Sequence, residues 1–300
     1  MLDLFDKNFL KTLRMLDIIT RKFFKRERMG VRRTRHRGSS QEFSDYKEYD
    51  PGDDLRFLDW NIYGRLDRMF IKLFYSEESL NLYLLVDTSA SMGFGSPAKL
   101  EYARRIAAAI AYVGLTRHDR VHVLLFADGL LGQPFSGTRG GHVLTLFRFL
   151  EKLTASSAGD FEKSAKEFVL RTKRPGPVFV LSDFFFDSDT QTALRLLEYH
   201  RFETTCLHLL DPLEESPRYS GLCHLVDSED GSLRELDLDS PTLSLYRDLL
   251  GEFCRELEAG CAGMRVAYHR VPTSTPFENV ILGLFRERKA LAAPARAEAP

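Results

Sequence analysis

The sequence predicts an α/β fold: a doubly wound, mostly parallel sheet with an N-terminal helix and an appended segment. Two observations carry this prediction. Short apolar runs rich in β-branched and aromatic residues recur at 82–86, 121–126, 178–181, 205–210 and 264–271, and each is too short for a helix. Stretches with apolar residues at helical spacing occur at 99–117, 142–153, 161–171 and 190–200. Strands that alternate with helices pair in parallel through right-handed crossovers.

Further elements are predicted before and after these alternating strands and helices. Apolar residues at three- and four-residue spacing predict an amphipathic helix over 2–26, and a hairpin is expected at 225–236, followed by a helix at 243–258. We therefore expect an N-terminal helix and appended segment packed on the sheet at 1–80, an α/β domain at 81–288 and a disordered tail at 289–300, which is rich in alanine and proline.

Charge and cysteine content limit the function classes. Lysine plus arginine (42) nearly balances aspartate plus glutamate (43), so no global field attracts nucleic acid or anionic membrane. A basic stretch at 21–37 precedes an acidic one at 42–59, and we interpret them as one solvated, charge-balanced face; a nucleic-acid patch and an acidic partner surface are the alternatives. The four cysteines form no CxxC pair, and the chain shows no signal peptide or membrane span. We expect a reduced, cytoplasmic protein.

Polar oxygens follow the first strand directly. Asp87, Ser89 and Ser91 present one carboxylate and two hydroxyls at alternate positions of a turn that opens toward a helix. Oxygen ligands of this kind suit a hard cation such as magnesium, manganese or calcium, and neutral hydroxyls leave charge on the ion for an incoming carboxylate. The third strand ends at Asp183, which places a second carboxylate at the same edge of the sheet. The alternative is that Asp87 and Ser89 only cap the following helix.

These residues resemble known families. The DxSxS pattern after a hydrophobic strand resembles the metal-ion-dependent adhesion site of von Willebrand factor A domains, which share a Rossmann-type sheet. A longer upstream block resembles the bacterial domain-of-unknown-function family fifty-eight, whose members couple it to a von Willebrand factor A-like domain. That block comprises Gly38, Glu42, Phe43, the run Tyr49-Asp50-Pro51-Gly52-Asp53-Asp54-Leu55-Arg56-Phe57-Leu58-Asp59-Trp60, Arg65, Lys72, Leu73 and Phe74.

The resemblance implies a ligand set and a partner. Ser89 and Ser91 would bind Mg²⁺ or Mn²⁺ directly, Asp87 through water or directly, and Asp183 would close the site. The second loop, which carries a threonine in adhesion domains, has Asp160 as the nearest equivalent here and Thr154 as the alternative. An aspartate there would lower the charge left for a partner's acidic side chain. Phe184 also replaces the glycine usual after the closing aspartate.

The block from Pro51 to Trp60 also has a structural interpretation. Pro-Gly-Asp-Asp favours a turn, Arg56 and Arg65 could pair with Asp54 and Asp59, and Phe57 and Trp60 could anchor the block to the sheet. We expect this core role for Trp60, with a partner surface as the alternative.

Three function classes follow. The first is a non-enzymatic, metal-dependent interaction module, and the resemblance implies an adaptor or co-chaperone of a MoxR-type AAA+ ATPase. The second is a metal-independent scaffold with a vestigial site. The third, a metal-dependent phosphoesterase, is disfavoured because Ser89 stands where such enzymes have a second aspartate, and no GxSxG, GxxxxGK or HExxH motif occurs.

Overall fold

The computed structural model describes residues 6–27, 43–74, 79–155, 158–229 and 231–292. The chain divides into two compact units: residues 1–23 with 80–300, here called the sheet unit, and residues 24–79, here called the insert unit. The basic residues at 28–37 and the tail beyond residue 292 lie outside the described residues.

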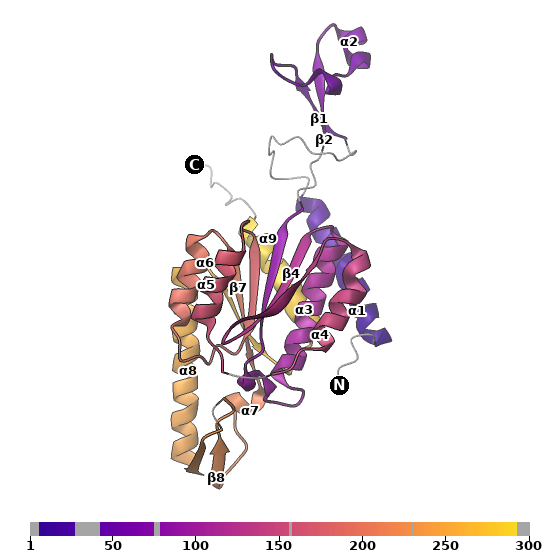
Figure 1. Cartoon of the computed structure of the whole chain (residues 1–300). Coiled ribbons are helices and arrows are strands. Elements are labelled where there is room, and N and C mark those ends of the chain that lie inside the picture. The colour runs from indigo at the N-terminus through magenta and orange to yellow at the C-terminus, as the bar shows by residue number, and fades with distance from the viewer. Residues whose placement is uncertain (1–5, 28–42, 75–78, 156–157, 230, 293–300) are drawn as a thin grey trace, which may run out of the picture. The chain divides into compact units, whose positions relative to one another are not determined.

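The sheet unit is built on a six-stranded sheet (Figure 1). Its strand order is β10-β7-β6-β3-β4-β5, and all neighbours pair in parallel except β5, which is antiparallel to β4. The strands are β3 (Asn81–Asp87), β4 (Arg120–Ala127), β5 (Gly129–Gly137), β6 (Pro177–Ser182), β7 (Glu203–Leu210) and β10 (Ala267–Pro272). The predicted mostly parallel, doubly wound α/β sheet is confirmed.

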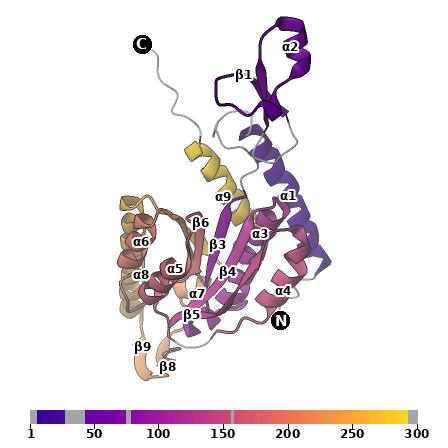
Figure 2. The same cartoon turned by 45° about the horizontal axis from the view of Figure 1, so that its top comes forward.

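Helices cover both faces of this sheet (Figure 2). One face packs α1 (Lys7–Glu27), α3 (Lys99–Thr116), α4 (Val143–Glu151) and α9 (Phe277–Ala292). The other packs α5 (Phe161–Arg171), α6 (Thr190–Tyr199) and α8 (Ser240–Gly263). Side chains along β3 point alternately to the two faces of the sheet. Leu84 and Val86 belong to the apolar core on the first face, and Tyr83 and Leu85 belong to the core on the second. A strand buried on both faces has to be continuously apolar, which is the pattern that its sequence shows.

Short elements complete the sheet unit. The 3₁₀ turns η2 (Ala90–Gly93) and η3 (Gly140–His142) precede α3 and α4, and the one-turn helix α7 (Pro212–Glu215) follows β7. An antiparallel hairpin, β8 (Gly221–Val226) with β9 (Leu233–Leu238), lies between α7 and α8 in the chain, as the turn signals predicted. Most of the hairpin's side chains are exposed.

The sequence analysis did not predict the short helix α7 or two longer elements of the sheet unit, β5 and α9. The edge strand β5 contains Gly129, Gly132, Gln133 and Pro134. Glycine and proline are unfavourable in strands, so the sequence does not predict a strand here. The helix α9 packs Phe277 and Ile281 into the core and continues to Ala292, past the start of the expected tail. Within the described residues, no helix combines the length and apolar content needed to cross a bilayer.

The insert unit pairs β1 (Phe43–Glu48) with β2 (Phe70–Phe74) and carries η1 (Leu55–Phe57) and α2 (Trp60–Leu66) between them. Asp59 organises it: its carboxylate caps α2, accepts a 3.0 Å hydrogen bond from Tyr46 Oη and lies 3.1 Å from Lys72 Nζ. Arg56 pairs with Asp54 at 2.7 Å, as expected, whereas the partner of Asp59 is Lys72 and not Arg65.

The expected core role for Trp60 is wrong. Trp60 is 68% exposed, and its ring meets Tyr63 edge-on with centroids 6.2 Å apart. Trp60 is the first residue of α2, directly after the cap Asp59, and α2 has no buried residue. Leu58 and Ile71 supply the buried apolar contact of this unit instead.

Candidate functional site

The two predicted acidic strand ends meet at the carboxyl edge of the sheet. Strands β3 and β6 are parallel neighbours, with Val86 opposite Leu181, so Asp87 and Asp183 emerge from adjacent strands. Both residues are fully buried. The Asp87 carboxylate accepts hydrogen bonds from Ser182 Oγ at 2.5 Å and from the Ser89 amide at 2.8 Å. The centre of the site is therefore the buried Asp87 carboxylate, which is hydrogen-bonded by its own loop and by the neighbouring strand β6.

The two serines of the first loop also come together. Ser89 Oγ and Ser91 Oγ are hydrogen-bonded to each other at 3.1 Å at the start of η2. Ser89 is buried, and Ser91 is partly exposed. The Ser89 side chain makes no capping hydrogen bond to η2, although Ser89 is its N-cap residue. The alternative that Ser89 serves only as a helix cap therefore finds no support in its contacts.

A buried lysine that the sequence analysis did not single out lies in the same place. Lys99, the first residue of α3, is 1% exposed, and its ammonium group donates to Asp183 Oδ2 at 2.7 Å and to Glu214 Oε1 at 2.5 Å. Glu214 is oriented by α7, where its other carboxylate oxygen accepts the Asp211 amide in a capping box. The pattern Asp211-Pro212-Leu213-Glu214 is a sequence signal for that box, but nothing in the sequence points it toward Lys99.

The electrostatics of the site follow from burial. Burial, followed by the negative charge of the nearby Asp183 carboxylate, raises the pKa of Asp87 to about 7. Burial by itself would lower the pKa of Lys99, but Asp183 and Glu214 outweigh that effect and raise it. Lys99 is therefore a permanent cation. The Asp183 carboxylate forms an ion pair with this ammonium group, whereas the Asp87 carboxylate accepts hydrogen bonds from Ser182 and from the Ser89 amide.

The second loop approaches the first through small residues. A side chain at Gly159 would come within 3.2 Å of Ser89 Cβ, and one at Gly93 would contact Ala155 Cβ at 3.5 Å. The Asp160 carboxylate caps α5 by accepting the Lys163 amide at 3.0 Å, and Thr154 is exposed. The contacts of Asp160 are thus those of a helix cap, and its proposed part in ion binding stays a prediction.

The β8–β9 hairpin contributes a carboxylate that the sequence analysis treated only as part of a turn. Glu229 Oε1 is buried without a hydrogen-bond partner among the described residues. Burial raises the pKa of Glu229, the Gly159 amide opposes that effect, and the negative charge of Asp183 adds to it. Glu229 therefore covers the loop next to Ser89 and adds negative charge to the site.

Phe184 and His208 close the site from the side of α8. Phe184 has a φ of 57°, in the left-handed region that favours glycine, although its side chain is buried against Phe161 and His208. At Phe184 the backbone therefore has a conformation that glycine adopts more readily than other residues. His208 Nδ1 bonds Tyr268 Oη at 2.6 Å, and burial lowers its pKa to about 4.

The donor set decides which ion this edge of the sheet could hold. No group of three or more His, Cys, Asp or Glu side chains within the described part of the chain is placed to hold a metal. An ion would therefore depend on serine hydroxyls together with Asp87, a set of hard oxygen donors. The 3.1 Å separation of the two hydroxyls suits this, because two oxygens bound at right angles about 2.1 Å from one Mg²⁺ lie about 3 Å apart.

Comparisons with known proteins place the chain in a family. An uncharacterized protein of Mycobacterium tuberculosis (strain ATCC 25618 / H37Rv), Rv1480, is 27% identical over 207 residues, which are 67% of this chain and 65% of that protein. The uncharacterized protein Mb1516 of Mycobacterium bovis matches to the same extent. The matched part thus spans just under two thirds of these relatives.

Solved structures with a similar arrangement have low sequence identity. An aerotolerance-related membrane protein of Bacteroides fragilis is 16% identical, with 70% of this chain and 100% of that chain covered and a TM-score of 0.46. The conserved hypothetical protein BatB of Bacteroides thetaiotaomicron is 13% identical, with coverages of 71% and 100% and a TM-score of 0.45. The VWA domain of SpRpn10 is 11% identical, with coverages of 69% and 95% and a TM-score of 0.40.

The family match covers more than half of the chain and includes residues 45–79 of the insert unit and the strand ends described above. The family model for the protein of unknown function DUF58 matches residues 45–247, more than half of the sequence. The chain belongs to the DUF58 family.

Proposed function

We propose that this chain is a non-enzymatic protein-interaction module that docks partners at the carboxyl edge of its sheet, and that Mg²⁺ or Mn²⁺ held by Asp87, Ser89, Ser91 and Asp183 takes part in docking. The observation that carries the proposal is the pair of serine hydroxyls 3.1 Å apart beside a buried carboxylate. When bound, the ion supplies a positive charge that an acidic side chain of the partner can complete.

Lys99 affects how much charge such an ion retains. Because its ammonium group already neutralises Asp183, the ion faces one fewer uncompensated carboxylate. Neutral serine oxygens then leave more of the ion's charge for a partner. Asp160 is the weaker candidate ligand, since its carboxylate is in use as the cap of α5.

The concrete partner is a MoxR-type AAA+ ATPase, which makes the chain an adaptor or co-chaperone. This choice rests on the family resemblance and on no contact in the structure. The docking face combines the serine loop, the partly exposed Ser91 and the β8–β9 hairpin. Glu229 lies over the loop beside Ser89, so an acidic partner group has to displace it or share a cation with it.

A second candidate function is a metal-independent scaffold, and one observation favours it. Lys99 brings a built-in cation into the site, where it bonds two carboxylates. A partner could then dock on the hairpin and the serine loop without any ion. A phosphoesterase has no comparable support, because Ser89 occupies the position where such an enzyme has its second aspartate.

Calorimetric titration of the full chain with Mg²⁺ and Mn²⁺ tests the proposal. We expect saturable binding that is lost in a Ser89→Ala/Ser91→Ala variant, since this change removes both hydroxyls and leaves the Lys99 pair intact. Ser244→Ala, on the exposed face of α8, is the matched control and should bind as the wild type does. Circular dichroism confirms that each variant is folded.

The partner is tested separately with a purified MoxR-type ATPase of the same organism. Docking that weakens about tenfold or more in chelator supports metal-dependent binding. Docking that is unaffected by chelator, in a protein that binds neither ion, favours the scaffold. If the ATPase binds neither with the ion nor in chelator, it is excluded as the partner.

A further inference from the structure

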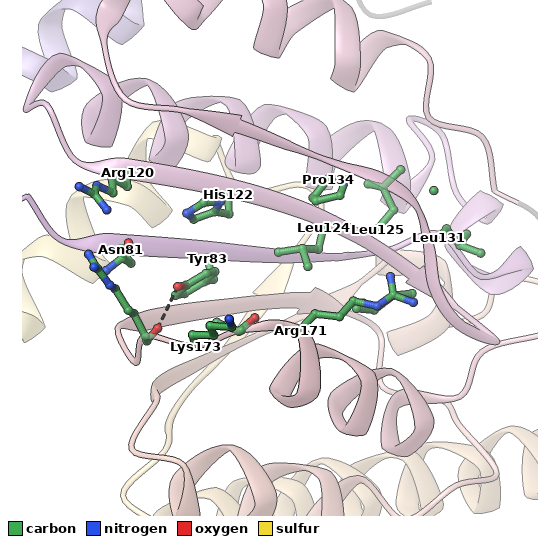
Figure 3. A pocket seen from close by; sticks show the side chains of 14 residues that line it. Asn81, Tyr83, Arg120, His122, Leu124, Leu125, Leu131, Pro134, Arg171 and Lys173 are labelled. Carbon is green, nitrogen blue, oxygen red and sulfur yellow. Dashed lines mark hydrogen bonds between the residues drawn. The ribbon is translucent and has the colours of Figure 1, made fainter.

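A pocket lies along the part of the sheet formed by β3, β4 and β5. It has a volume of about 350 Å³ and opens between the first half of β3, the strand β4, the edge strand β5 and the chain that follows α5 (Figure 3). Asn81 lines this pocket and Asp87 belongs to the serine site, and the two residues stand at opposite ends of β3. At about 3.3 Å per residue they are about 20 Å apart. The pocket shares no lining residue with the serine loop, Asp87 or Asp183. Its other end comes closer to that site, because the lining residue Leu125 pairs with Val86, the residue before Asp87.

An irregularity in β5 creates the pocket. Val123 pairs with Phe135 and Leu125 pairs with Leu131, so residues 132–134 of β5 stand opposite a single residue of β4, Leu124. Gly132 has a φ of 57°, and Pro134 has no amide hydrogen to donate to the ladder. The strand leaves its partner here and exposes an apolar floor that includes Leu124, Leu130, Leu131 and Pro134. Leu125 also borders the pocket, but its side chain packs against the core on the opposite face of the sheet.

The rim of the pocket is basic. Arg120, Arg171, Lys173 and Arg174 line it, and no aspartate or glutamate does. Arg171 pairs with Glu167 at 3.1 Å. In the parts of the chain that the structure describes, the other three cations form no ion pair within 4.0 Å, and all three are exposed. This local excess of positive charge contrasts with the near balance of charges in the whole chain.

The wall of the pocket is ordered by specific contacts. Tyr83 and His122 stack with ring centroids 5.1 Å apart and an interplanar angle of 16°. Tyr83 Oη donates a 2.9 Å hydrogen bond to the Arg174 carbonyl, the dashed line in Figure 3, which ties the segment after α5 to β3. His122 Nδ1 bonds Ser136 Oγ at 2.8 Å. The backbone that carries the cations is thus fixed in the absence of a ligand, which lowers the ordering cost of binding.

The arrangement of charges selects the class of ligand. Arg120 and Arg171 lie toward opposite ends of the groove, with Lys173 between them (Figure 3). These cations do not converge on one point, as they would for a single phosphate. We propose that this pocket binds an acidic peptide segment of a partner protein, with an apolar side chain on the leucine floor and its carboxylates against Arg120, Lys173 and Arg174.

The probe for this site is a fluorescein-labelled peptide, Glu-Phe-Glu-Leu-Glu, titrated with the full chain and followed by fluorescence anisotropy. We expect saturable binding that weakens about tenfold in an Arg120→Glu/Lys173→Glu variant, because two attractive charges become repulsive. Arg195→Glu/Arg255→Glu is the matched control, since both arginines are exposed on helices that do not line the pocket, and it should bind as the wild type does.

Two further probes separate the elements of the proposal. A peptide with serine in place of phenylalanine and leucine should bind more weakly, which tests the apolar floor. Inorganic phosphate should compete only at much higher concentration than the unlabelled peptide. The proposal is overturned by an absence of saturable binding, by equal loss in both charge-reversal variants, or by phosphate competing as well as the peptide does.

Discussion

The ammonium group of Lys99 lies 2.7 Å from Asp183 Oδ2 at the carboxyl edge of the sheet, and the two side chains are 1% and 0% exposed. A buried ion pair in this position stabilises the fold only while both partners are present, since either charge alone is costly to bury. The same pair determines the charge of the candidate site.

Removal of Lys99 should therefore destabilise the protein strongly. We expect Lys99→Met to lower the free energy of unfolding by about 3–5 kcal/mol, because Asp183 and Glu214 lose their common cation. Urea denaturation followed by circular dichroism measures this change. Lys163→Met is the control: it removes an exposed pair with Asp128 and should cost less than about 1 kcal/mol. A Lys99→Met/Asp183→Asn variant should recover part of the loss, and no recovery would contradict the pairing.

Stability should depend on pH through His208. Burial holds the pKa of His208 at about 4, below the ordinary value of 6.5, so the folded protein keeps the ring neutral where the unfolded chain binds a proton. The free energy that this residue contributes is present above pH 6.5 and is lost as pH falls toward 4. Between pH 7.5 and 5.5 we expect a loss of about 1.4 kcal/mol.

The effect of His208 is isolated by comparison of variants. His208→Asn should flatten this part of the stability profile relative to wild type, while His200→Asn, at an exposed position, should leave the profile unchanged. Identical pH profiles for all three proteins would rule out a neutral buried His208.

Glu229 should gain stability when its charge is removed. Glu229→Gln takes away a carboxylate that is partly desolvated and repelled by Asp183, so we expect a rise of a few tenths to about 1 kcal/mol in the free energy of unfolding. Glu235→Gln, exposed on β9, should have no effect. A loss of stability in Glu229→Gln, measured in chelator, would mean that the carboxylate has a cationic partner.

Two substitutions distinguish whether Asp160 only caps α5 or also binds the ion. Asp160→Ala removes the cap of α5 and should cost about 1 kcal/mol, whereas asparagine caps as well as aspartate, so Asp160→Asn should keep the stability. Asp189→Ala removes the equivalent cap of α6 and is the control: it should lower stability to a similar extent and leave Mg²⁺ affinity unchanged. If Asp160 also binds the ion, Mg²⁺ affinity will fall in Asp160→Asn while stability does not.

Trp60 provides a direct spectroscopic check of the insert unit. It is the single tryptophan and is 68% exposed, so its emission should resemble that of a free tryptophan derivative and be quenched efficiently by acrylamide. A blue-shifted, protected emission would show that Trp60 is buried in solution. In that case the anchoring role expected from the sequence would be restored.

Local patterns in the sequence determined the parallel sheet, most of its helices and the serine loop. Strand β3 could be predicted because residues 82–86 are all apolar, and Asp87, Ser89 and Ser91 could be grouped because they lie within a span of five residues. The family block around residues 49–60 could be recognised in the same way. Each of these depends on spacing along one short segment.

The tertiary structure alone decided what surrounds that loop. Lys99, Glu214 and Glu229 come from α3, α7 and the β8–β9 turn, and no spacing in the sequence connects them. The edge strand β5 was missed because its glycines and Pro134 contradict strand propensity, which long-range pairing with β4 overrides. The local sequence around a lysine does not show whether its side chain is buried or exposed. Its environment is set by which segments the fold brings together, and that is a property of long-range packing.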